Sequence, residues 1–180
     1  MVFIQEEKGM ELSMWWKRGK IRQESLPEQV GAIGSPVLGE IEEGRGGERP
    51  EVAVCPREEK VYAPTAGKII RLYPPGNALS FRTDSGVELF IRVGDSTDEL
   101  LSRYYRPRVL QNEIVAKGKL LLEFDRAGLA AEGIFPRVIL TVDNCIYGRE
   151  IFPVQEGNVR PGEELLKIYS YSGFAQAALN

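Results

Sequence analysis

The 180-residue sequence contains no histidine. Histidine is the side chain that most often acts as a general acid or base near neutral pH, and it is a common zinc ligand. Its absence excludes imidazole chemistry and the usual histidine-containing metal centres from this chain. Cysteine is also scarce. Cys55 and Cys145 lack any metal-ligand spacing, so we expect two reduced, partly buried thiols rather than a disulfide.

Long apolar runs and an excess of positive charge are missing as well. The formal net charge is −3, which gives no electrostatic reason to expect nucleic-acid binding. No apolar run approaches the roughly 20 residues that span a bilayer, and Val2–Ile4 is too short for the core of a signal peptide. We therefore expect a protein of the cytoplasm.

The segment Val61–Gly94 has the clearest pattern in the chain. Apolar residues recur at every second position over Val87–Ile91, which is the period of a half-buried strand. Gly67, Pro74–Gly76 and Asp84–Gly86 interrupt the segment with turn-forming residues. The pattern predicts four short strands joined by tight turns.

Weaker patterns outside this segment complete the expected fold. Pro136–Asn144 is rich in β-branched residues and predicts a strand, and Gly157–Ile168 predicts a turn followed by a strand. The charged, glycine-rich Glu42–Pro50 predicts a mobile loop, and Arg126–Glu132 is the one short helix that we expect. Together these patterns predict an all-β domain, a flattened antiparallel sandwich or barrel of short strands.

Four short motifs follow one another in a recognisable order. They are Ser35–Ile41 (SPVLGEI), Ala63–Gly67 (APTAG), Arg82–Leu89 (RTDSGVEL) and Gly157–Ile168 (GNVRPGEELLKI). Together they resemble the glucose-type IIA domain of the bacterial phosphoenolpyruvate-dependent sugar phosphotransferase system. The resemblance implies the fold of that domain, an antiparallel β-sandwich built from a duplicated hybrid motif. It divides the chain into an N-terminal extension (1–29), a IIA-like domain (30–170) and a C-terminal tail (171–180).

The two histidines of that family are replaced in this chain. According to the resemblance, Asn77 occupies the position of the family's first histidine. Arg92 occupies the position of the second histidine, which accepts the phosphoryl group in the family. A guanidinium stays protonated and has no free lone pair, and an amide does not titrate. We therefore expect a protein that has lost phosphotransfer and acts as a binding or regulatory protein. We expect no cofactor and no metal ion, because the zinc site of the family uses both histidines.

The resemblance also indicates binding positions and partners. The candidate binding residues are Asn77, Phe90, Arg92, Ser96 and Thr97. The candidate partners are a phosphohistidine carrier protein and a sugar permease domain.

Other interpretations of these residues remain open. Arg92 is either an anion-binding contact or a surface side chain that pairs with an acidic residue among 95–99. Asn77 is either a ligand or a turn residue. A working carrier with a relocated acceptor would use Cys145, Ser96 or Thr97. A scaffold or peptidase-regulating role is a third hypothesis, which rests on fold analogy alone.

The N-terminal extension has its own pattern. Apolar and polar residues alternate over Met10–Lys17, which favours a strand, and Lys17–Arg22 is basic beside two tryptophans. An ordinary strand or frayed terminus is the main interpretation. Contact with a membrane surface is the alternative, since glucose-type IIA domains can carry a membrane-associating tail.

Overall fold

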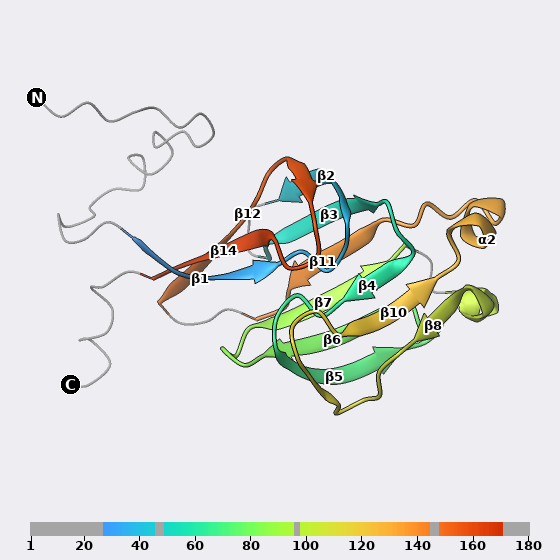
Figure 1. Ribbon diagram of the computed structural model, residues 1–180, viewed down its shortest axis with the longest axis horizontal. Helices are drawn as coiled ribbons and strands as arrows, with labels where there is room; N and C mark the ends of the chain where they lie inside the picture. Colours follow the sequence, from blue (N-terminus) through green and yellow to red (C-terminus); the bar gives the residue numbers. More distant parts are fainter. Residues whose placement is uncertain (1–26, 46–48, 96–97, 145–147, 171–180) are drawn as a thin grey trace, which may run out of the picture.

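The structure is a computed structural model that describes residues 27–45, 49–95, 98–144 and 148–170. Its described residues form three antiparallel sheets, so the all-β sandwich prediction is confirmed (Figure 1). The largest sheet has eight strands in the order β13-β2-β3-β11-β7-β6-β5-β9. In chain order these are β2 (Gly39–Arg45), β3 (Glu51–Pro56), β5 (Gly67–Tyr73), β6 (Ala78–Thr83), β7 (Glu88–Val93), β9 (Ile114–Val115), β11 (Val138–Val142) and β13 (Gly157–Val159).

Two smaller sheets of three strands accompany the large one. The first has the order β1-β14-β12, with β1 (Glu28–Gly34), β12 (Arg149–Pro153) and β14 (Glu164–Ser170). The second has the order β4-β10-β8, with β4 (Lys60–Tyr62), β8 (Tyr105–Pro107) and β10 (Leu120–Phe124). A 3₁₀ helix, η1 (Glu99–Tyr104), precedes β8, and a short helix, α2 (Arg126–Ala131), follows β10. Helix α2 lies at the opposite end of the molecule from the described chain ends (Figure 1).

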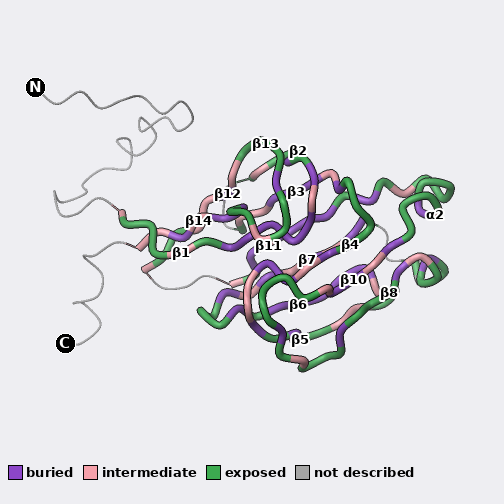
Figure 2. The backbone as a smooth tube through the Cα atoms, in the orientation of Figure 1, coloured by how far each residue is buried: buried purple, intermediate pink, exposed green. Residues whose placement is uncertain are grey.

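The core follows from the period-two pattern of the strands. In β3 and β7, partly exposed and buried residues alternate without a break. Figure 2 shows buried segments in β3, β7 and β11 of the large sheet. One continuous apolar cluster fills the interior, and its largest fully buried side chains include Phe81, Leu89, Leu121, Leu140 and Leu165. Burial of such side chains is the main stabilising contribution to a fold of this kind.

The strands predicted in Val61–Gly94 are confirmed as β4, β5, β6 and β7. Gly67, the last residue of the APTAG motif, begins β5 at a point of very close packing. A Cβ atom there would lie 2.3 Å from the carbonyl oxygen of Arg82 and 2.8 Å from the Phe81 ring. Asn112 has a φ angle of 71°, the left-handed conformation that asparagine tolerates better than most residues.

One expectation about a loop is wrong, and one helix was not expected. The segment Glu42–Pro50 is not a loop from its start, because β2 continues to Arg45 and pairs with β3 up to Glu51. Backbone pairing with β3, across a bulge after Ile41, overrides the charged and glycine-rich composition. Helix α2 agrees with the expected helix, but η1 was not expected.

Helix η1 is stabilised by contacts at its two ends. The Asp98 carboxylate accepts a hydrogen bond from the Leu100 amide at 2.9 Å, which caps the first turn. At the other end, the Tyr104 hydroxyl donates to Glu132 at 2.8 Å, and Arg103 forms an ion pair with the same carboxylate. These contacts hold η1 beside α2.

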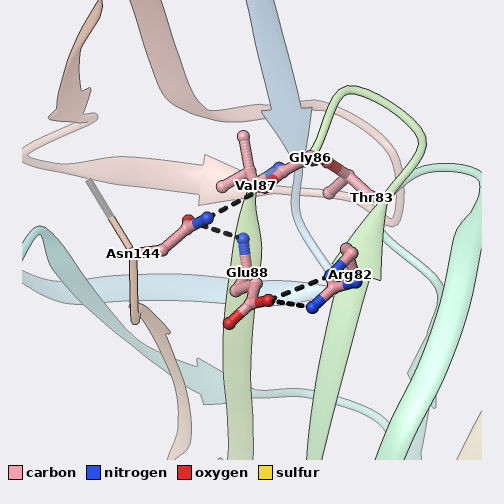
Figure 3. A network of polar contacts seen from close by, with 6 residues as sticks. All are labelled: Arg82, Thr83, Gly86, Val87, Glu88 and Asn144. Atoms are coloured by element: carbon pink, nitrogen blue, oxygen red, sulfur yellow. Dashed lines mark hydrogen bonds and ion pairs between the residues drawn. The ribbon is translucent and has the colours of Figure 1, made fainter. Parts of the chain in front are cut away.

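A polar network fixes the turn between β6 and β7 (Figure 3). The Asn144 side chain donates to the Gly86 carbonyl at 2.9 Å and accepts from the Glu88 amide at 2.8 Å. The Thr83 hydroxyl accepts from the Val87 amide at 2.9 Å, and Arg82 forms an ion pair with Glu88. The end of β11 is therefore tied to the start of β7, which helps to hold the register of the central strands.

Among the described residues, no helix is long and apolar enough to cross a membrane. The predicted strand over Met10–Lys17 and the basic segment Lys17–Arg22 lie outside the described residues.

Candidate functional site

Pairing of β6 with β7 brings the candidate residues Asn77 and Arg92 together. Asn77 directly precedes β6, and its carbonyl accepts a hydrogen bond from the Val93 amide at 2.8 Å. Ala78 lies opposite Arg92 in the same pair. The candidate residues Asn77 and Arg92 are thus neighbours across two strands, although fifteen positions separate them in the sequence.

The Asn77 side chain points into the protein. Its exposed fraction is 5%, and its amide donates a hydrogen bond to the Val93 carbonyl at 3.1 Å. The buried Tyr105 hydroxyl donates to the same oxygen at 3.4 Å. Burial raises the pKa of Tyr105 to about 12, so this hydroxyl stays a donor across the physiological range. Two buried donors therefore converge on the backbone next to Arg92.

Arg92 is accessible but already paired. Its side chain is 35% exposed, and its guanidinium lies 3.1 Å from the Asp95 carboxylate. The surface ion pair that was one of the two interpretations of Arg92 is therefore present. Its partner is Asp95, whereas Asp98 caps η1.

The side chains around Arg92 form one face of the large sheet, which we call the outer face. We define it by Tyr73, Ser80, Phe90, Arg92 and Ile139. Strand register places Ser80 opposite Phe90, and Arg92 between Ala78 and Ile139. The Tyr73 ring packs edge-on against Phe90 with a centroid distance of 5.5 Å, and its hydroxyl is 3.0 Å from the Ser80 hydroxyl. The outer face thus has an aromatic centre beside Arg92.

Two further arginines, one on β2 and one just before β11, are matched by carboxylates. Arg45 pairs with Glu43 at 2.6 Å, and Arg137 pairs with Glu42 at 3.3 Å. The hydrogen bond from Arg45 holds the pKa of the Glu43 carboxyl below its usual value. These surface pairs are each worth little energy, but each gives its arginine a counter-charge.

The structure places only some of the remaining candidate residues. Phe90 lies on the outer face with Arg92, as described above. Ser96, Thr97 and Cys145 lie outside the described residues. Sequence reasoning did not place Ser80, Tyr105 or Tyr73 at the site. Side chains alternate between the two faces along β6 and β7. This alternation was the signal that could have placed Ser80 beside Phe90.

A cavity of about 810 Å³ lies elsewhere in the molecule. It is lined by residues of the β3–β4 turn and the β13–β14 region, among them Arg57, Tyr62 and Arg160. No residue of the outer face lines it, so it is separate from the site. Within the described ranges, no three acidic or cysteine side chains gather in a way that could hold a metal ion.

The fold is that of a IIA sandwich. Among solved structures, it is similar to glucose permease IIA from Mycoplasma capricolum, with a TM-score of 0.63. The sequence identity is 24%, and the similarity covers 77% of this chain and 94% of that chain.

The sequence comparisons define the family. A family model described as phosphoenolpyruvate-dependent sugar phosphotransferase system, EIIA 1, matches residues 47–146. The chain belongs to this family, and the resemblance found in its motifs is confirmed.

Two curated relatives illustrate the similarity. The β-glucoside-specific EIIBCA component of Halalkalibacterium halodurans is 32% identical over 117 residues, which is 65% of this chain and 18% of the relative. The glucosamine-specific EIICBA component of Bacillus subtilis is 37% identical over 73 residues, which is 41% of this chain and 12% of the relative. The matching region therefore spans less than a fifth of the length of these relatives.

Proposed function

We propose that this chain is a IIA-type domain that binds a component of the sugar phosphotransferase system without accepting a phosphoryl group. The observation that carries the proposal is the pair of side chains at positions 77 and 92. One is an amide bonded to a buried carbonyl, and the other is a guanidinium paired with Asp95. The sequence contains no imidazole that could replace them.

Neither side chain has the chemistry of a phosphoryl acceptor. The acceptor needs a lone pair that can attack phosphorus while the partner's histidine leaves. Arginine remains protonated, since its pKa lies above about 12, and the asparagine amide nitrogen donates hydrogen bonds but does not titrate. Asn77 is also turned away from the surface. A phosphoryl group that arrives at this face would therefore stay on the partner.

The same residues are suited to binding. Arg92 is accessible, and its planar fork of donors suits phosphate oxygens. Phe90 and Tyr73 offer aromatic contact area beside it. Family membership supports a partner from the same transport system, either the histidine-phosphorylated carrier protein or a permease domain. The protein would act as a regulatory binder that occupies this partner without removing its phosphate.

Asp95 limits how strongly Arg92 can prefer a phosphorylated partner. A phosphoryl group must compete with a carboxylate that already lies 3.1 Å from the guanidinium. The proposal therefore predicts a modest preference for the phosphorylated carrier over the unmodified carrier. Replacing Asp95 with asparagine should increase that preference, because it removes the competing charge.

Surface plasmon resonance with both forms of the carrier tests the binding role. We expect saturable binding of the carrier, with tighter binding of the phosphorylated form. We also expect the preference to weaken in Arg92→Ala and to grow in Asp95→Asn. Measurements at two salt concentrations should show a larger preference at low salt, where exposed charges are less screened. Absence of binding to both carrier forms and to the permease domain would contradict the proposal.

A further inference from the structure

One arginine beside the outer face differs from the others because it has no carboxylate partner among the described residues. Arg45, Arg82, Arg92 and Arg137 each form an ion pair with a carboxylate. Arg71, on β5, is exposed and makes no ion pair with any residue that the structure describes. Its positive charge is therefore available to a ligand without displacing a carboxylate.

Arg71 is held in place by an aromatic ring. Its guanidinium carbon lies 4.9 Å from the centroid of the Tyr73 ring, which is the distance of a cation–π contact. The ring itself is fixed by its edge contact with Phe90 and by its hydroxyl contact with Ser80. The side chain is thus pre-positioned over the surface, which lowers the entropy cost of binding an anion.

Strand register places this arginine next to the site. Arg71 lies opposite Ser80, and Ser80 lies opposite Phe90, so the three residues form one row across β5, β6 and β7. Arg92 is two residues beyond Phe90 on the same face of β7. Because β5 and β7 are two strand spacings apart, about 10 Å, two long arginine side chains can reach a ligand between them.

A second unpaired cation lies on the same strand. Lys68 is exposed, lies opposite Arg82, and makes no ion pair within the described ranges. The β5 side of the outer face therefore has an excess of positive charge, whereas the glutamates of β2 and β3 lie on the other side. Such an asymmetry favours an anionic group at the β5 side.

We infer that Arg71 is the residue that recognises the phosphoryl group of a phosphorylated partner on the outer face. This inference rests on the proposed function, since it assumes that such a partner docks there. The guanidinium offers two parallel donors to phosphate oxygens, and the Ser80 and Tyr73 hydroxyls lie beside it. Arg92, already engaged by Asp95, contributes less to the preference than Arg71.

The test compares two arginines that carry the same charge. Arg71→Ala and Arg82→Ala each remove one cation near the outer face, but only Arg82 has a carboxylate partner. The preference is measured as the ratio of affinities for the phosphorylated and unmodified carrier protein. We expect the ratio to fall about fivefold or more in Arg71→Ala and to stay within about twofold in Arg82→Ala. Arg71→Lys, which keeps the charge but loses the fork, should give an intermediate ratio.

The outcomes separate this inference from the proposed function. If the wild-type chain binds neither form of the carrier, the proposed function fails and the inference fails with it. If the wild-type chain prefers the phosphorylated form and Arg71→Ala keeps that preference, the assignment of Arg71 is wrong while the binding role stands. Equal losses in Arg71→Ala and Arg82→Ala would indicate a general charge effect and would also overturn the assignment.

Discussion

The Asn77 side chain donates a hydrogen bond to the carbonyl oxygen of Val93 at 3.1 Å, across the pair of strands that forms the site. The Tyr105 hydroxyl reaches the same oxygen from η1 and β8. Asn77 therefore has a structural role here. It satisfies a buried carbonyl directly beside Arg92.

Asn77→Ala should destabilise the protein, because it removes a donor from the buried Val93 carbonyl. We expect the free energy of unfolding to fall by about 1–3 kcal/mol. Asn158→Ala is the matched control, since the exposed Asn158 accepts a hydrogen bond from the exposed Arg57, and we expect a change of at most about 0.5 kcal/mol. Urea unfolding measures both. Equal effects in the two variants would contradict the structural role of Asn77.

Gly67→Ala should be strongly destabilising. Its Cβ atom would lie 2.3 Å from a backbone oxygen and 2.8 Å from the fully buried Phe81 ring, so either the strand pair or the core must shift. We expect a loss of about 2 kcal/mol or more. In Gly31→Ala, the nearest atom to the new Cβ is 3.8 Å away, so that variant should unfold close to the wild-type temperature. A thermal unfolding series in which Gly67→Ala is as stable as Gly31→Ala would refute this packing.

Because of Tyr105, the free energy of unfolding should fall as the pH becomes alkaline. Burial raises its pKa from 10.0 to about 12 in the folded protein, so the folded state holds the proton more tightly than the unfolded chain. This contribution is fully present below about pH 10 and is lost as the pH rises towards about 12. Tyr105→Phe removes it while keeping the ring. The stability difference between wild type and Tyr105→Phe should therefore shrink between about pH 10 and about pH 12, and a constant difference would argue against burial of the hydroxyl.

Asn144→Ala should loosen the β6–β7 turn, since its side chain makes two hydrogen bonds to that turn (Figure 3). We expect a loss of about 1–2 kcal/mol in the free energy of unfolding. Glu88→Gln removes only the exposed ion pair with Arg82 and should cost at most about 1 kcal/mol. Amide hydrogen exchange should show faster exchange at Glu88 in Asn144→Ala. Unchanged exchange there would mean that the network does not hold the turn.

Much of the fold could be predicted from local patterns. The turn residues within Val61–Gly94 and the alternation over Val87–Ile91 were sufficient for β4 to β7, because each depends on neighbours in the sequence. The extent of β2 was not predictable in this way. Arg45 is in a strand because Glu51, on the next strand, pairs with it, and composition does not report such pairing.

Less of the site could be predicted. The resemblance pointed to Asn77 and Arg92 as candidate residues, but the direction of the Asn77 side chain depends on the carbonyl of Val93. Asp95 as the partner of Arg92 was among the expected acidic neighbours, since it follows three residues later. The roles of Tyr105 and Arg71 depend on contacts between distant segments or on ring packing, which no local pattern records.

Phosphoryl transfer to the wild-type chain shows whether the protein, with Asn77 and Arg92, can accept a phosphoryl group. The protein is incubated with phosphoenolpyruvate, enzyme I and the phosphocarrier protein, and its intact mass is then measured. The matching region of the β-glucoside-specific relative serves as the positive control. We expect the control to gain one phosphoryl group while this chain keeps its unmodified mass. A stoichiometric gain of one phosphoryl group on this chain would overturn the proposed function and would direct the search to Cys145, Ser96 and Thr97.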